Sequence, residues 1–134
     1  MRGGLAIALC LGLAACAAPA PTASVDGVAA QKMLAESLAV YGAKLRMARQ
    51  IALSCERYEF NDQMQVALSA ARPDTADGRL QAIRQASGID LASDVETRSF
   101  QARHGVEVGV DNLCAAGDRE VAEQTGISAL LVAS

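Results

Sequence analysis

Residues 28–58 read VAAQKMLAESLAVYGAKLRMARQIALSCERY, and the spacing of the apolar side chains in this stretch decides the fold class. Successive members of the apolar set are four or three positions apart, which keeps them on one face of an α-helix. The set consists of Leu34, Leu38, Tyr41, Leu45, Ala48, Ala52 and Cys55. Gly42 is the weak point, because glycine costs about 1 kcal/mol relative to alanine inside a helix. The pattern predicts one long amphipathic helix over the whole stretch.

Shorter helices are expected after it. A capped helix is predicted over residues 61–71, and Pro73 follows it because the residue before a proline avoids the helical region. A third helix is predicted over residues 75–88, with Gly88 as its left-handed stop. A fourth is predicted over residues 93–104, opened by the S-x-x-E capping box. Their expected core residues are Met64, Leu68, Ala71, Leu80, Ile83, Val95 and Phe100.

The C-terminal part predicts a connector and a closing helix. Residues 106–110 (VEVGV) alternate like a strand, but the sequence offers no second strand, so we interpret them as an extended connector. Asp111 is expected to cap the last helix, which Gly126 is expected to break before its final turn. The residues expected on or beside its inner edge are Val110, Leu113, Cys114, Gly117, Val121, Thr125, Ile127, Leu130 and Leu131. The sequence thus predicts an all-α fold, a small bundle of four to five helices.

Composition limits the class of protein. The chain has 134 residues, enough for one small domain. Its net charge of −3 provides no basic footprint for nucleic acid, so no nucleic-acid partner is expected. No apolar run reaches the roughly 18 residues that a helix needs to cross a bilayer.

The first residues have the pattern of an export signal. Arg2 supplies a positive charge, and residues 3–13 (GGLAIALCLGL) form an apolar run that is too short for a membrane span. The run ends in Leu13-Ala14-Ala15-Cys16, which resembles the lipobox of bacterial lipoproteins. The resemblance implies that the chain is cut before Cys16 and that Cys16 carries lipid. Ordinary cleavage near Ala18 or Ala20, with loss of Cys16, is the alternative.

This resemblance sets the expected domain organisation. Residues 1–15 are the signal peptide, residues 16–27 the lipidated cysteine and an Ala/Pro-rich linker, and residues 28–134 the helical domain. Two of the three prolines lie in the uncharged run AAPAPTAS, which favours an extended spacer. Ala17 follows the cysteine where aspartate would signal inner-membrane retention in enteric bacteria. The outer membrane is therefore the expected location, on the periplasmic side.

The four cysteines are expected to have three different fates. Cys10 is lost with the signal and Cys16 carries lipid, which leaves Cys55 and Cys114 as an even pair in an exported domain. Such a pair is expected to form a disulfide in an oxidising compartment, and the long loop that it would close contributes roughly 4 kcal/mol in loop-entropy estimates. Two buried free thiols are the alternative. A redox pair is disfavoured because there is no C-x-x-C motif.

A second resemblance covers the domain itself. Residues 51–55 (IALSC), 100–106 (FQARHGV) and 113–121 (LCAAGDREV) are similar to segments of small exported all-helical domains of unknown function in alphaproteobacteria. Those domains share a cysteine that ends the first long helix and a C-x-x-G-x-x-E-[IV] closing helix. The likeness spans about residues 40–131, with a shorter middle here. It implies a fold and a disulfide, and no activity.

Candidate chemistry is sparse. His104, Glu107 and Asp111 would form a metal-binding face on a continuous helix, but Gly105 argues against that helix, and we expect no metal and no cofactor. A zinc site needs more ligands than two distant cysteines and one histidine offer. The carboxylates of Glu56, Glu59 and Asp62 are expected to form a solvated face. Glu120 is expected to hydrogen-bond within the bundle.

Two functional classes remain from this reading. The favoured hypothesis is a lipid-anchored periplasmic protein, with membrane lipid bound through Cys16, that acts as a non-enzymatic accessory or interaction protein of the cell envelope. The expected partner is then another envelope protein. The alternative is a small periplasmic inhibitor or ligand-binding helical module that uses a groove between helices.

Overall fold

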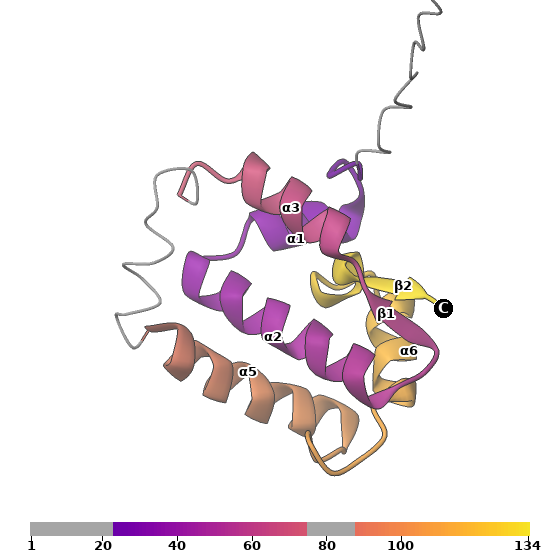
Figure 1. Cartoon of the computed structure of the whole chain (residues 1–134). Helices are drawn as coiled ribbons and strands as arrows, with labels where there is room; N and C mark the ends of the chain where they lie inside the picture. Colours follow the sequence, from indigo (N-terminus) through magenta and orange to yellow (C-terminus); the bar gives the residue numbers. More distant parts are fainter. Residues whose placement is uncertain (1–22, 75–87) are drawn as a thin grey trace, which may run out of the picture.

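Helix α2 (Leu38–Ser54) is the central element of the molecule, and α5 (Gly88–His104) lies along it (Figure 1). The computed structural model describes residues 23–74 and 88–134. The other elements are α1 (Val28–Leu34), β1 (Tyr58–Phe60), α3 (Asp62–Ala71), α6 (Cys114–Ala122), the 3-10 helix η1 (Ile127–Leu130) and β2 (Leu131–Ala133). The predicted class, a small helical bundle stapled by a disulfide, is confirmed.

The predicted long N-terminal helix is two helices. Helix α1 ends at Leu34, and Ser37 begins α2, with its side chain accepting a hydrogen bond from the backbone N–H of Val40. A serine that caps in this way stabilises a helix start by about 1 kcal/mol. The prediction of one helix was wrong because the apolar spacing continues across a break that the capping serine makes.

Arg72 fixes the end of α1 from the far end of α3. Its side chain is 5% exposed and donates hydrogen bonds to the backbone carbonyls of Met33 and Leu34 and, at 2.9 Å, to that of Glu36. Its guanidinium also lies 4.7 Å from the centre of the Tyr41 ring. Because the last carbonyls of a helix have no partner within the helix, this arginine supplies the donors that they need.

The core lies on the predicted face of α2. Of the predicted set, Leu38, Tyr41, Ala48 and Cys55 are buried, whereas Leu45 and Ala52 are half-buried. The buried residues Ala43, Met47 and Ile51 were not predicted. The other helices and η1 complete the core with Met33, Leu68, Phe100, Leu113, Ala116, Ile127 and Leu130. The inward prediction was confirmed for Leu68 and Phe100 and wrong for Ala71, which is exposed.

Helix α5 begins earlier than the helix predicted over residues 93–104, and the helix predicted before it lies outside the described residues except for Gly88. Helix α5 already includes Gly88, so this glycine does not stop a helix, and the S-x-x-E box of residues 93–96 lies inside α5 instead of at its start. Val95, expected in the core, is 60% exposed. The capping pattern predicted the start of this helix about one turn too late, because Ile89 packs against α2 and extends the helix toward its N-terminus. The predicted core residues Leu80 and Ile83 lie outside the described residues.

The C-terminal part also departs from one closing helix. Helix α6 ends at Ala122, and the chain continues through η1 into β2. Asp111 does not cap α6. Asn112 accepts the hydrogen bond from the backbone N–H of Cys114 instead. Val110 and Val121, expected at the inner edge, are 73% and 41% exposed.

A small antiparallel sheet joins the two halves of the chain. Strand β1 pairs with β2 in the register Tyr58↔Ala133, Glu59↔Val132 and Phe60↔Leu131. No strand was predicted in either segment, since three residues are too few for a period of two to be recognised. Residues 106–110 form no strand, as expected, but the predicted extended connector is wrong for residues 108–110, which form a turn in which the backbone N–H of Val110 donates to the carbonyl of Glu107. No helix in the described ranges is long and apolar enough to span a membrane.

Candidate functional site

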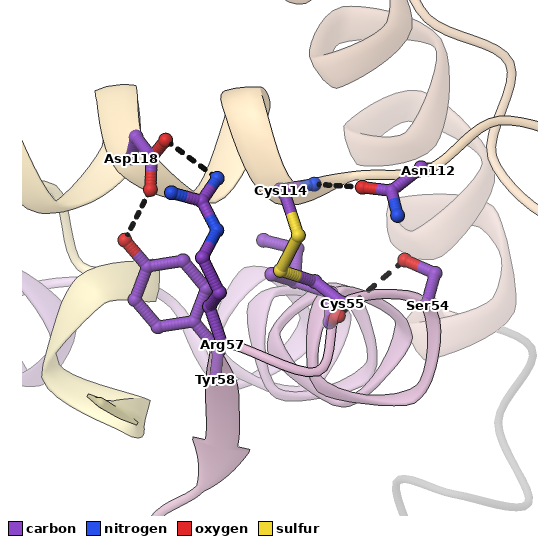
Figure 2. Close-up of a disulfide and its surroundings, with 8 residues drawn as sticks. Ser54, Cys55, Arg57, Tyr58, Asn112, Cys114 and Asp118 are labelled. Atoms are coloured by element: carbon purple, nitrogen blue, oxygen red, sulfur yellow. Dashed lines mark hydrogen bonds and ion pairs between the residues drawn. A yellow bond between two sulfur atoms is a disulfide. The ribbon is translucent and has the colours of Figure 1, made fainter. Parts of the chain in front are cut away.

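The predicted disulfide between Cys55 and Cys114 is present and ties the end of α2 to the start of α6 (Figure 2). The two Cα atoms are 5.0 Å apart, and the sequence separation is 59 residues. Cys55 is 1% exposed, while Cys114 is half-buried. Both thiols are therefore consumed in a bond, and neither is available as a nucleophile or a metal ligand.

A polar cluster lies beside the disulfide and holds β1 against α6. Asp118 accepts hydrogen bonds from the Tyr58 hydroxyl at 2.7 Å and from Arg57 at 2.8 Å (Figure 2). The Tyr58 hydrogen bond is the main cause that holds the pKa of Asp118 below its ordinary value, and Arg57 adds to it. Burial, followed by the neighbouring Asp118 carboxylate, raises the pKa of Tyr58. Gly117 makes the approach possible, because a Cβ there would lie 2.8 Å from the Tyr58 ring.

Glu120 forms the second polar cluster, in the interior. Its side chain is fully buried, and Oε1 is 2.6 Å from His104 Nε2 and 3.2 Å from an Arg103 nitrogen. The hydroxyl of Thr125 donates to the other carboxylate oxygen. The expected hydrogen bonding of Glu120 within the bundle is thus confirmed. The cluster joins the last turn of α5 to α6 and to the turn that follows it.

The predicted carboxylate sets are placed as follows. His104 ends α5 and faces Glu120, whereas Asp111 accepts a hydrogen bond from the backbone N–H of Glu107, so the His104, Glu107 and Asp111 set is not assembled. Within residues 23–74 and 88–134, no three histidine, cysteine or carboxylate side chains are grouped as a metal site. The second predicted set is exposed, as expected for a solvated face; its members are Glu56, Glu59 and Asp62.

A hollow that the sequence analysis missed lies between α2, α3 and α5. It has a volume of about 190 Å³, and its polar lining residues are Arg46 and Arg49 of α2 and Gln65 of α3. Gly42 and the buried side chain of Ile89 form part of the apolar lining. The spacing of Arg46 and Arg49, three apart on a helix, was the available signal, because such residues share a helix face.

The two arginines are held from opposite sides. Arg46 donates to Asp90 at 2.7 Å and to Ser93 at 3.1 Å, both on α5. Arg49 donates to Gln65 of α3 at 2.7 Å and lies over the Phe60 ring, 4.2 Å from its centre. The side chains are 52% and 51% exposed, so both guanidinium groups remain accessible to solvent.

A strongly exposed apolar residue stands at the end of α2. Leu53 is 82% exposed and lines two further surface hollows. One, of about 330 Å³, includes Phe60, and the other, of about 410 Å³, includes Val110. These hollows are open depressions at the surface, on the two sides of the last turn of α2.

The predicted lipidation site, Cys16, lies outside the described residues, as do the signal peptide and most of the linker. Comparison with known proteins adds no assignment: the chain matches no protein-family model, no curated protein and no solved structure.

Proposed function

We propose that this protein is a lipid-anchored periplasmic protein, attached through Cys16, that serves as a non-enzymatic accessory or interaction protein of the cell envelope. The Leu13-Ala14-Ala15-Cys16 sequence after a charged start and an apolar run is the observation that carries the proposal. Two or more acyl chains hold a protein durably at a membrane, whereas one does so only marginally. The outer membrane is the proposed site, since Ala17 follows the cysteine.

The disulfide supports export. A bond between Cys55 and Cys114 persists in an oxidising compartment and is rare in a reducing cytosol. The polar groups that could have suggested catalysis serve the fold instead: His104 and Glu120 bond to each other in the interior, and Asp118 bonds to Tyr58. This internal pairing favours an interaction protein over an enzyme.

Intact-mass analysis of the native protein tests the anchor. We expect a chain that begins at Cys16, carries the mass of the acyl groups and is lighter by the two hydrogen atoms that are lost when the disulfide forms. Cys16→Ser should shift the protein from the membrane to the soluble fraction, and Cys10→Ser is the matched control that should leave it in the membrane. An unmodified cytosolic chain with residues 1–15 intact would overturn the proposal.

Photo-crosslinking in native envelopes tests the interaction part. A crosslinker at Leu53 samples a side chain that is exposed and apolar, and one at exposed Gln63 of α3 is the control. We expect one reproducible protein adduct from position 53. A protein that stays monomeric and without an adduct at both positions would contradict an interaction role while leaving the anchor intact. The resemblance to small alphaproteobacterial domains remains a prediction beside this proposal.

A further inference from the structure

The hollow between α2, α3 and α5 combines positive charge with an apolar floor. Arg46 and Arg49 stand three positions apart on α2, and neighbours at this spacing lie about 5–6 Å from each other at Cβ. Gln65 adds an amide, while Gly42 and Ile89 contribute apolar surface. Among the described lining residues there is no carboxylate, although each arginine pairs with an aspartate that does not line the hollow, Asp90 for Arg46 and Asp62 for Arg49.

Both guanidinium groups are oriented and retain donors. In the described part of the chain, Arg46 uses one terminal nitrogen for Asp90 and Ser93, and Arg49 uses one terminal nitrogen for Gln65 and Asp62. Each guanidinium has five N–H donors in a planar fork that matches an oxyanion. The remaining donors are therefore open to an incoming oxygen ligand.

The existing ion pairs are a small obstacle. The carboxylates of Asp90 and Asp62 are 72% and 81% exposed, and the Arg49–Asp62 separation is 3.8 Å. Exposed pairs of this kind contribute about 0–1 kcal/mol. An anion that takes the place of these carboxylates at the arginines therefore gives up about 0–1 kcal/mol for each pair.

We propose that this hollow binds a small oxyanion with a short apolar body, such as an alkyl phosphate or a short-chain carboxylate. The anionic group bonds to Arg46 and Arg49, and the apolar body lies against the Gly42 and Ile89 surface. The volume of about 190 Å³ restricts the ligand to a few heavy atoms, below the roughly 300–1,000 Å³ of sites for drug-sized ligands. The site goes beyond the proposed function and does not depend on the anchor at Cys16.

Binding of butyl phosphate tests the proposal on the protein as isolated from its own cells. Dissociation constants come from NMR titration of the arginine side-chain resonances, with inorganic phosphate and butanol as the two half-ligands. We expect butyl phosphate to bind more tightly than either. Arg46→Gln and Arg49→Gln should each weaken it about fivefold or more, because each removes a charged donor.

Arg119→Gln is the matched control, since it removes one positive charge from an exposed position on α6, outside the hollow. Arg46→Lys and Arg49→Lys keep the charge, lose the planar fork and should give intermediate affinity. Equal weakening by Arg119→Gln, equal binding of butanol or inorganic phosphate, or no binding at millimolar butyl phosphate would overturn the site. None of these outcomes bears on the mass or the location of the protein, so the anchor is tested separately.

Discussion

Glu120 shows how a single buried charge depends on its neighbours. Its carboxylate has no exposed surface, and its partners come from α5 and from the turn after α6. Removal of one partner from a buried ionic cluster leaves the others with unmet charge, which costs more than the interaction contributed. A substitution in this cluster is therefore expected to weaken the packing of α5 against α6 and the turn that follows α6.

Replacement of Glu120 by alanine should lower the free energy of unfolding by about 3 kcal/mol, because the buried side chain of His104 loses its partner and Arg103 keeps only Glu96 of its two carboxylate partners. Urea unfolding of the full chain measures the change. Glu123→Ala, at an exposed position just after the same helix, should stay within about 0.5 kcal/mol of the parent protein. A similar loss in both variants would show that the cluster contributes no more than a surface carboxylate.

Asp118 gives a prediction for pH. Its pKa is lowered in the folded protein, first by the Tyr58 hydrogen bond and also by Arg57. Folding thus favours the ionised form, so the stabilisation is present above the ordinary carboxyl pKa of about 4 and is lost as the pH falls through the lower folded value. Asp118→Asn should be less stable than the parent at pH 7, and the gap should narrow in acid. A gap that stays constant down to pH ~2 would contradict the linkage.

At this scale the sequence predicted more about burial than about partners. Cys55 and Cys114 were placed on inner faces because they share the helical spacing of apolar residues, and Cys55 is buried while Cys114 is half-buried. The His104–Glu120 pair could not be predicted, since it depends on the path of the loop between α5 and α6. The Tyr58–Asp118 bond likewise requires the β1–β2 pairing, which leaves no periodic signal in three residues.

Helix boundaries follow from competition between local signals and packing. The apolar face of α2 was predictable because five of its side chains repeat at helical spacing, namely Leu38, Tyr41, Leu45, Ala48 and Ala52. The first four of them belong to the core or pack against it. The break before α2 was not predictable, because Ser37 caps a helix at a point where the apolar spacing continues. The early start of α5 was not predictable either, because Ile89 packs against α2 directly after Gly88, where the helix before it was expected to stop. Gly42 is unfavourable by helix propensity alone, but it lies where Ile89 approaches α2. A Cβ at position 42 would be 3.2 Å from the Ile89 side chain.

The contact between α6 and β1 depends on the absence of a side chain at Gly117. Gly117→Ala would place a methyl group 2.8 Å from the Tyr58 ring and 3.0 Å from Ile51. Crowding of this kind costs about 1–3 kcal/mol, which outweighs the gain of about 1 kcal/mol in helix propensity. We expect a lower thermal midpoint by calorimetry.

Gly88→Ala is the control for that substitution, since nothing lies within 4 Å of a Cβ at the first residue of α5. It should leave the midpoint unchanged or raise it. If Gly117→Ala raised the midpoint as well, the close approach of Tyr58 would not limit packing there.

At the scale of the whole molecule, the Cys55–Cys114 disulfide covalently joins distant parts of the described chain. Cys55 belongs to the end of the first half and Cys114 to the start of the closing segment, and the β1–β2 sheet repeats the same connection through hydrogen bonds. The cysteine count, together with the expectation that the chain is exported, was enough to predict the pairing. The sheet that accompanies it was not predictable.

Cys55→Ser with Cys114→Ser should lower the free energy of unfolding by about 4 kcal/mol, the value expected for a loop of this length. Guanidinium unfolding measures the loss, and reduction of the parent protein should reproduce it. The native bond should also react slowly with small thiols, because the Cys55 side is only 1% exposed. Rapid reduction without unfolding, or a double variant as stable as the parent, would contradict a structural role.

The same bond changes what proteolysis would reveal. A protease that cuts one peptide bond between Glu56 and Leu113 separates the backbone into two pieces that stay joined through sulfur. Such a nicked molecule would migrate as a single species on a non-reducing gel and as two fragments once a reducing agent is added. A single cut would then alter the surface of this protein without releasing any part of it.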